Sequence, residues 1–129
     1  MAYYYSKVIK DGSFDNVIAK VTDDLKKEGF GVLSVIDVKN TLMEKINVDF
    51  KKYTILGACH PHAAHKILQK EDKAGVFFPC NVVVEENEDG SIEVFAVDPY
   101  ASMKSIDNDQ IGCHLLDIQQ KLMKVIDNA

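Results

Sequence analysis

The sequence predicts a single α+β domain over residues 1–129, in which a mixed, largely antiparallel sheet packs against helices. Two observations support this prediction. Apolar segments typical of strands alternate along the chain with segments whose apolar residues recur at helical spacing. Near residue 90, two strand-like segments flank Asn87-Glu88-Asp89-Gly90, a sequence that favours an antiparallel hairpin. The composition, with 47% hydrophobic and 27% charged residues, is typical of a globular domain.

The first part of the chain predicts two strands, each followed by a helix. Residues 3–9 are rich in aromatic and β-branched residues and form the first expected strand. Ser13 is placed to cap a helix that ends at Gly29. Residues 30–36 are almost wholly apolar, which predicts a buried strand. Asp37 is then expected to cap a second helix, in which apolar residues recur every four positions.

The middle of the chain predicts a further strand and helix. Residues 53–58 form a short apolar strand. Pro61 suits the first position of a helix, where its missing N–H is no loss, and this helix is expected to end near Lys70. Residues 75–78 are apolar and predict a brief strand that stops at Pro79.

A hairpin and a closing helix complete the predicted domain. The hairpin strands are expected at residues 81–86 and 91–97. In the final segment the apolar residues are separated by alternating steps of four and three, which predicts the core face of a helix. These residues are Ile111, Leu115, Ile118, Leu122 and Val125.

Composition restricts the classes of partner. The net charge of −5 argues against nucleic acid, because phosphate binding requires a basic surface. No apolar run is long enough to cross a bilayer, and the N-terminal residues lack the pattern of a secretory signal, so we expect no membrane partner. The three cysteines are far apart and form no Cys-x-x-Cys pair, which suits reduced thiols. A cytoplasmic protein is therefore expected.

Five segments resemble, in the same order, the family described as domain of unknown function 302. They are residues 29–37, 53–59, 64–65, 78–82 and 97–99, and they span nearly the whole chain. The resemblance implies a small α+β fold that is often dimeric, so a homodimer is expected, and it implies no established activity. Members of the family usually carry Asn-Pro after the cysteine that matches Cys59. Here His60 stands in place of the asparagine, and His62 is an additional imidazole.

The chemically most distinctive stretch is Cys59-His60-Pro61-His62-Ala63-Ala64-His65, where a predicted strand meets a predicted helix. Unpaired N–H groups at a helix N-terminus and a neighbouring imidazolium both stabilise a thiolate, which would make Cys59 reactive. The alternative is that Cys59 is a small buried residue at the end of the strand. The pattern leaves open whether the protein is an enzyme.

The same stretch suggests a transition-metal site, for example for zinc. His62 and His65 are three residues apart and share one side of a helix, and Cys59 and His60 could complete the ligand set. The spacing differs from that of structural zinc motifs, which usually group four ligands in two separated pairs. In the alternative interpretation His60 is a helix cap, His62 lies on the surface and His65 lies at the edge of the core.

Three further residues are candidates for this site. Cys80 begins a hairpin strand and could approach Cys59 if their strands are neighbours, which would permit redox or persulfide chemistry. Asn81 offers an amide and Asp98 a carboxylate. The alternative roles are packing for Cys80 and turn formation for Asn81 and Asp98. Cys80, Asp98 and His65 also match the motifs of the family.

Three functional hypotheses follow. The first is a domain that binds a small molecule or a metal, with Cys59, His65, Cys80, Asn81 and Asp98 around the site. The second is a thiol-based redox or sulfur-transfer protein, in which Cys59 and His65 are the candidate catalytic residues: Cys59 reacts, and His60 or His65 tunes it. The third is a structural homodimer module whose cysteines and histidines only pack.

Overall fold

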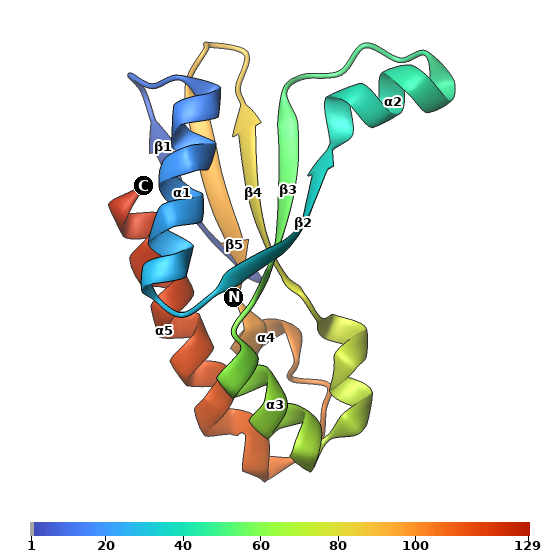
Figure 1. The fold of residues 1–129 in the computed structure, drawn as a ribbon, viewed down its shortest axis with the longest axis vertical. Helices are drawn as coiled ribbons and strands as arrows, with labels where there is room; N and C mark the ends of the chain where they lie inside the picture. The colour runs from blue at the N-terminus through green and yellow to red at the C-terminus, as the bar shows by residue number, and fades with distance from the viewer. Residues whose placement is uncertain (1) are drawn as a thin grey trace.

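The computed structural model describes residues 2–129, which form one five-stranded sheet with helices (Figure 1). The strand order is β1-β5-β4-β3-β2, and each of the neighbouring pairs is antiparallel. The predicted α+β class is confirmed, and the predicted hairpin is the β4–β5 pair. The strands are β1 (Tyr4–Ile9), β2 (Gly31–Asp37), β3 (Tyr53–Cys59), β4 (Cys80–Glu86) and β5 (Ile92–Val97).

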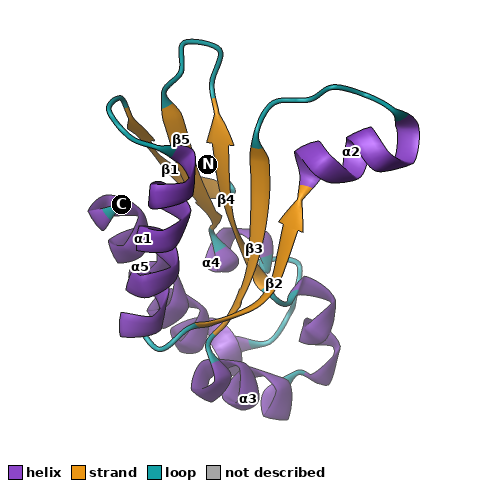
Figure 2. Cartoon of the chain, turned by 45° about the horizontal axis from the view of Figure 1, so that its top comes forward, coloured by secondary structure: helices purple, strands orange, loops and turns teal. Residues whose placement is uncertain are grey.

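Two long helices, α1 (Phe14–Lys27) and α5 (Gly112–Asn128), lie side by side against one face of the sheet (Figure 1, Figure 2). Ser13 caps α1 as predicted, because its Oγ accepts a hydrogen bond from the Asn16 N–H at 3.3 Å. No helix between residues 2 and 129 is long and apolar enough to cross a membrane. The core lies between these two helices and the sheet, and includes Val21, Leu25, Leu56, Val82, Val84, Val94, Leu122 and Ile126.

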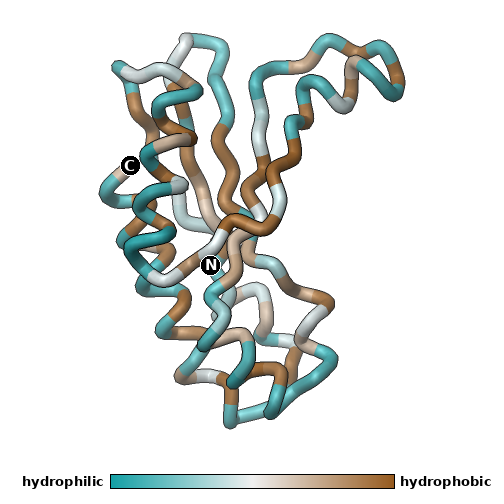
Figure 3. The backbone as a smooth tube through the Cα atoms, viewed as in Figure 1, coloured by the Kyte–Doolittle hydropathy of each residue, from teal (hydrophilic) through white to brown (hydrophobic). Residues whose placement is uncertain are grey.

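The strand predicted at residues 30–36 is present as β2, but the prediction that this strand is buried is wrong, because β2 is an edge strand of the sheet. Its outer edge pairs with no other strand of the described chain. Leu33 is 71% exposed and Val35 is 63% exposed. The helix α2 (Val38–Ile46), which Asp37 caps as predicted, projects away from the sheet and buries none of its residues (Figure 1). Figure 3 shows the apolar stretch of β2 along this outer strand.

The helix α3 (Pro61–Lys70) begins and ends as predicted. The prediction of a brief strand at residues 75–78 is wrong, because most of this stretch belongs to the 3₁₀ helix η1 (Asp72–Phe77). Pro79 has no N–H to donate, and the ladder with β3 begins only at Cys80. A short helix α4 (Pro99–Ser102) and a 3₁₀ turn η2 (Asp109–Ile111) then lead from β5 to α5.

The face of the sheet opposite α1 and α5 carries aromatic and acidic side chains. Tyr53 of β3 pairs with Glu85 of β4, and Glu85 pairs with Glu93 of β5, so the three residues form one row across the sheet. Phe95 lies in the next row, opposite Val83. Tyr53, Glu85, Glu93 and Phe95 are all only partly buried. We call this surface the open face.

Candidate functional site

Cys59 and Cys80 lie at adjacent ends of β3 and β4, as expected if these strands are neighbours. Both are free thiols. Burial raises the pKa of Cys59, and burial together with the charge of Cys59 raises the pKa of Cys80 to about 12. The direction is opposite to the one that the helix N-terminus alone suggested for Cys59, because desolvation has the larger effect. Both thiols are therefore protonated at neutral pH.

His60 is the histidine that the structure places beside these thiols. Its Nδ1 accepts a hydrogen bond from the Ala63 N–H at 3.3 Å, which caps α3. Its ring packs edge-on against Phe30, with 5.2 Å between the centroids. Burial and the Lys121 ammonium, 3.4 Å from Nε2, lower the pKa of His60. A neutral ring whose Nδ1 accepts must carry its proton on Nε2, so the Lys121 contact is not a hydrogen bond.

The structure does not assemble the metal cluster that the sequence suggested. His62 and His65 are both exposed on α3. Among residues 2–129 no three His, Cys, Asp or Glu side chains are grouped so that they could hold a metal ion. The reason is geometric. His60 precedes the helix and turns inward toward Phe30, whereas His65 lies on the outer surface of α3 rather than at the edge of the core.

The space around the two thiols is too small for a ligand. The cavity that Cys59, His60 and Cys80 line has a volume of about 10 Å³. Such a volume holds at most one water molecule. Its remaining walls are apolar or backbone: Phe30, Ala58, Ala64, Phe78, Pro79 and Ile118.

Asn81 and Asp98 lie elsewhere. Asn81 is exposed on the open face of β4, opposite Gly57. Asp98 caps α4, because Oδ1 accepts hydrogen bonds from the N–H groups of Tyr100 and Ala101. Both of its carboxylate oxygens also accept from Gln119 Nε2 at 3.0 Å. Neither Asn81 nor Asp98 lines the cavity at the thiols.

Thiol accessibility gives a first prediction. With iodoacetamide at pH 7, the exposed Cys113 should react first, Cys59 more slowly, and Cys80 about a thousandfold more slowly than an ordinary thiol, because its thiolate fraction falls tenfold per pKa unit. Mass spectrometry of timed samples measures the order. In urea, where burial is lost, the three rates should converge. Fast modification of Cys59 in the folded protein would instead show an activated nucleophile.

The buried imidazole gives a second prediction, on the pH dependence of stability. The folded state holds the pKa of His60 below its ordinary value, so the unfolded chain takes up a proton there more readily. Proton uptake by His60 in the unfolded chain therefore lowers the free energy of unfolding as the pH falls from about 6.5 to the lower pKa that His60 has in the folded state. Above about pH 6.5 the ring is neutral in both states and this effect is absent. Replacing His60 with asparagine keeps a side chain that can cap the helix but removes the ring contact with Phe30, so the variant should lose about 1 kcal/mol of stability at pH 8.

The measurement is urea unfolding of both proteins from pH 8 to pH 5. The stability of His60→Asn relative to the unchanged protein should rise as the pH falls, because only the unchanged protein has an imidazole at position 60 that is held neutral in the folded state. All other groups are the same in both proteins, so their contributions cancel in the comparison. A constant difference across this range would show that His60 is not held neutral.

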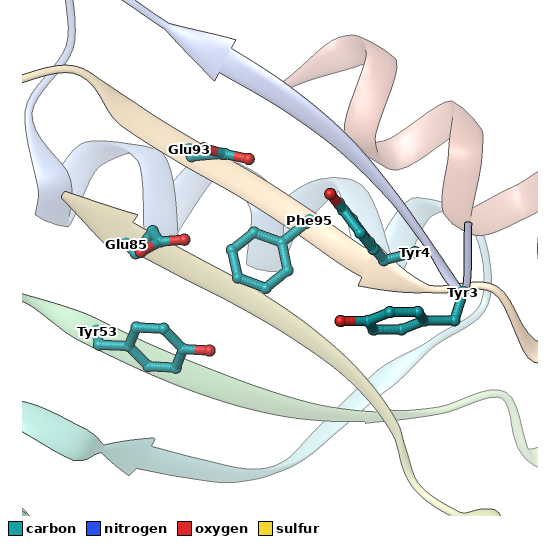
Figure 4. A pocket seen from close by; sticks show the side chains of 6 residues that line it. All are labelled: Tyr3, Tyr4, Tyr53, Glu85, Glu93 and Phe95. Atoms are coloured by element: carbon teal, nitrogen blue, oxygen red, sulfur yellow. The ribbon is translucent and has the colours of Figure 1, made fainter. Parts of the chain in front are cut away.

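A second and larger cavity, of about 310 Å³, lies on the open face (Figure 4). The ring centroids of Tyr4 and Phe95 are 6.1 Å apart, and those of Tyr53 and Phe95 are 6.4 Å apart, with interplanar angles of 70° and 69°. The hydroxyl groups of Tyr3 and Tyr53 point toward each other from opposite ends of the cavity (Figure 4). We call this site the aromatic cup; its lining residues are Tyr3, Tyr4, Tyr53, Glu85, Glu93 and Phe95.

The aromatic cup carries an excess of negative charge. Glu85 and Glu93 are directly opposed on neighbouring strands, an arrangement in which like charges repel. Lys51 forms an ion pair with the buried Oε1 atom of Glu85, and this contact raises the pKa of Lys51. No lysine in the part of the chain that the structure describes forms an ion pair with Glu93. Burial and the Glu85 charge raise the pKa of Tyr53, so its hydroxyl stays protonated.

Sequence reasoning did not identify this cup, although part of its signal was present. The sequence locates the hairpin near Asn87–Gly90, which brings Glu85 and Glu93 close together. In the structure they are directly opposite, because Asn87 pairs with Ser91 and the loop is the three residues 88–90. Alternation along the strand also puts Phe95 on the same face as Glu93. What the pattern did not reveal was which face the helices leave open. The aromatic residues at positions 3–5 predict a strand, and the sequence assigns them no role in a site.

The architecture defines a single-domain α+β protein, with two long helices on one face of an antiparallel sheet and a small cavity on the other. A family model described as "Domain of unknown function DUF302" matches residues 5–129, and the chain belongs to this family. The crystal structure of an uncharacterized conserved protein DUF302 from Bacillus stearothermophilus is similar, with 27% sequence identity, coverage of 98% of each chain and a TM-score of 0.90. No curated protein matches the chain. The family resemblance is thus confirmed.

Proposed function

We propose that this protein is a small-molecule-binding domain whose ligand site is the aromatic cup. The observation that supports the proposal is a cavity of about 310 Å³ that is lined by four aromatic rings and two carboxylates (Figure 4). This volume is at the lower end of the range for small-molecule sites, and the lining combines aromatic rings with two carboxylates and three phenol hydroxyl groups, which is more polar than such sites usually are. The proposal keeps the small-molecule hypothesis but moves it from the Cys59 turn to the open face.

The thiol-based alternative has weaker support. A reactive thiol needs a lowered pKa and access to its substrate, and burial acts against both at Cys59 and Cys80. His60 does not act as a base toward them in this geometry, because its Nδ1 accepts the Ala63 N–H and its Nε2 faces Lys121. We therefore propose that Cys59, His60 and Cys80 fix the junction between the sheet and α3, and do not bind the ligand.

A ligand screen tests the proposal. The ¹⁵N-labelled chain would be titrated with sets of small cationic, neutral and anionic compounds, and amide shifts would be followed. We expect at least one set to shift amides of β4 and β5 around Glu85 and Phe95. Phe95→Ala should abolish these shifts, whereas Asn81→Ala, at the other end of the same face, should not. Shifts confined to Cys59 and α3, or none with any set, would contradict the proposal.

We further propose that the protein acts as a homodimer joined through β2 and α2. Seven of the fourteen exposed large hydrophobic side chains fall between residues 33 and 50. Three of them lie on β2, whose outer edge offers unpaired hydrogen-bonding groups as a template for another strand, and the other four lie on α2 and the segment that leads from it to β3. A second copy of the same chain satisfies both features, because antiparallel β2–β2 pairing about a twofold axis is self-complementary. The seven are Leu33, Val35, Ile36, Met43, Ile46, Val48 and Phe50.

A further inference from the structure

We propose that the ligand of the aromatic cup is an alkylated ammonium group, such as a quaternary or methylated amine. This inference rests on the proposed function, since it names the chemical class that the same cavity selects. It is supported by two features of the cup: the arrangement of its rings and the unbalanced charge of its two glutamates.

The rings supply a surface for a weakly hydrated cation. The planes of Tyr4 and Tyr53 each stand nearly perpendicular to that of Phe95, at 70° and 69°. Tyr3 extends the series, with its ring 5.1 Å from that of Tyr4 and tilted by 62°. These pairs pack edge to face, so the rings stand as walls rather than as a flat stack, and a cation on the cavity side can contact the negative faces of more than one ring. Alkyl groups on the cation pack against the same rings.

The carboxylates supply the charge. Glu85 faces Glu93 across the β4–β5 ladder, and a single ammonium, that of Lys51, accompanies the two. Lys51 is attached at the rim, and its Nζ also lies 5.8 Å from the Phe50 ring, so it reaches Glu85 from the side of β3. The Glu93 carboxylate forms no ion pair with a described lysine, so we infer that it pairs with the cationic ligand. A bound cation would relieve the repulsion between the two carboxylates.

The same features disfavour the other ligand classes. An anion would meet two carboxylates and no free cation among the lining residues. A divalent metal ion needs more oxygen or nitrogen ligands than this cavity offers, and the described residues hold no such group. A neutral ligand fits the rings but does not use the charge of Glu93.

The test compares choline with 3,3-dimethylbutan-1-ol, a neutral compound of the same shape in which carbon replaces nitrogen. Each is titrated into the ¹⁵N-labelled full chain while the amides of β4 and β5 are followed. We expect choline to bind at least tenfold more tightly than the alcohol. Glu93→Gln should weaken choline binding about fivefold and leave the alcohol unaffected. Glu88→Gln, in the exposed turn of the same hairpin, is the matched control and should change neither affinity.

Folding does not confound this test, because Glu93→Gln removes a like-charge contact and should not lower stability. Equal affinities for the two compounds, or equal choline affinity in Glu93→Gln and Glu88→Gln, would overturn the ammonium assignment and leave binding at the cup intact. If choline fails to bind while a neutral or anionic compound shifts the cup, the same conclusion holds. If no compound of any class shifts the cup, the proposed function fails as well.

Discussion

Replacing Gly29 with alanine should destabilise the protein by about 2–3 kcal/mol, a large loss for one methyl group. Gly29 has φ of +90° and follows the last turn of α1, where the Phe30 N–H donates to the Leu25 carbonyl at 2.9 Å. An alanine is strained in this conformation. Its Cβ would also lie 2.8 Å from His60 Nε2. The imidazole would have to move, which weakens its cap on Ala63 and its contact with Phe30.

Gly90 provides the matched control. It has a similar φ of +84°, but a Cβ added there meets no atom within 4 Å. Gly90→Ala should therefore show only the backbone strain, about 1 kcal/mol. In a His60→Asn background, whose side chain is shorter, most of the additional loss from Gly29→Ala should disappear. Urea unfolding measures the free energy of unfolding of each variant, and the differences between the variants separate the backbone strain from the contact with His60. Equal losses at Gly29 and Gly90 would show that the His60 ring does not lie against Gly29.

Replacing Leu33 with aspartate should convert the proposed homodimer into a monomer, weakening dimerisation at least a hundredfold. In the isolated chain Leu33 is 71% exposed, so the carboxylate is solvated and the fold is retained. Leu33 interrupts the regular pairing of β2 with β3, between Val32 and Ser34, so it contributes little to the sheet itself. In a dimer the same carboxylate would be buried among apolar side chains without a partner. Sedimentation velocity at micromolar concentration measures the change.

Val76→Asp is the control for this prediction. Val76 is 83% exposed and lies on η1, away from β2 and α2. Val76→Asp introduces the same carboxylate at an apolar residue that is more exposed than Leu33. This variant should sediment as a dimer, like the unchanged protein. A monomeric unchanged protein would contradict the dimer proposal. A dimer that survives Leu33→Asp would place the interface on another surface.

The sequence predicted most of the local structure because local rules determine it. Ser13, Asp37 and Pro61 mark helix starts through hydrogen bonding and φ restriction, and the structure begins its helices at these residues. The turn signal at Asn87–Gly90 located the hairpin in the same way, but the observed register, with Glu85 opposite Glu93, differs by one residue from that of a four-residue turn. The burial of β2 could not be predicted from its apolar sequence, since burial depends on whether the chain itself or a partner covers the strand.

The candidate site was harder to predict, because the states of its residues depend on tertiary packing. A cysteine before a helix N-terminus favours a thiolate, but the apolar side chains packed around Cys59 reverse the direction of its pKa shift. His65 matches a motif of the family, yet its side chain is exposed on α3 and belongs to no site. His60 stands where the family usually has asparagine, and it is the histidine that lies beside the thiols. The cup combines the N-terminal segment with residues of β3, β4 and β5, whose proximity follows only from the strand order.

The most direct test of the account is the location of bound choline, measured by intermolecular nuclear Overhauser effects from its methyl protons. We expect contacts with the ring protons of Tyr4, Tyr53 and Phe95, and none with the rings of Phe30, His60 or Phe78. Such a result would place the ligand in the aromatic cup. Contacts with Phe30, His60 or Phe78 would instead place binding at the Cys59 turn and contradict the account.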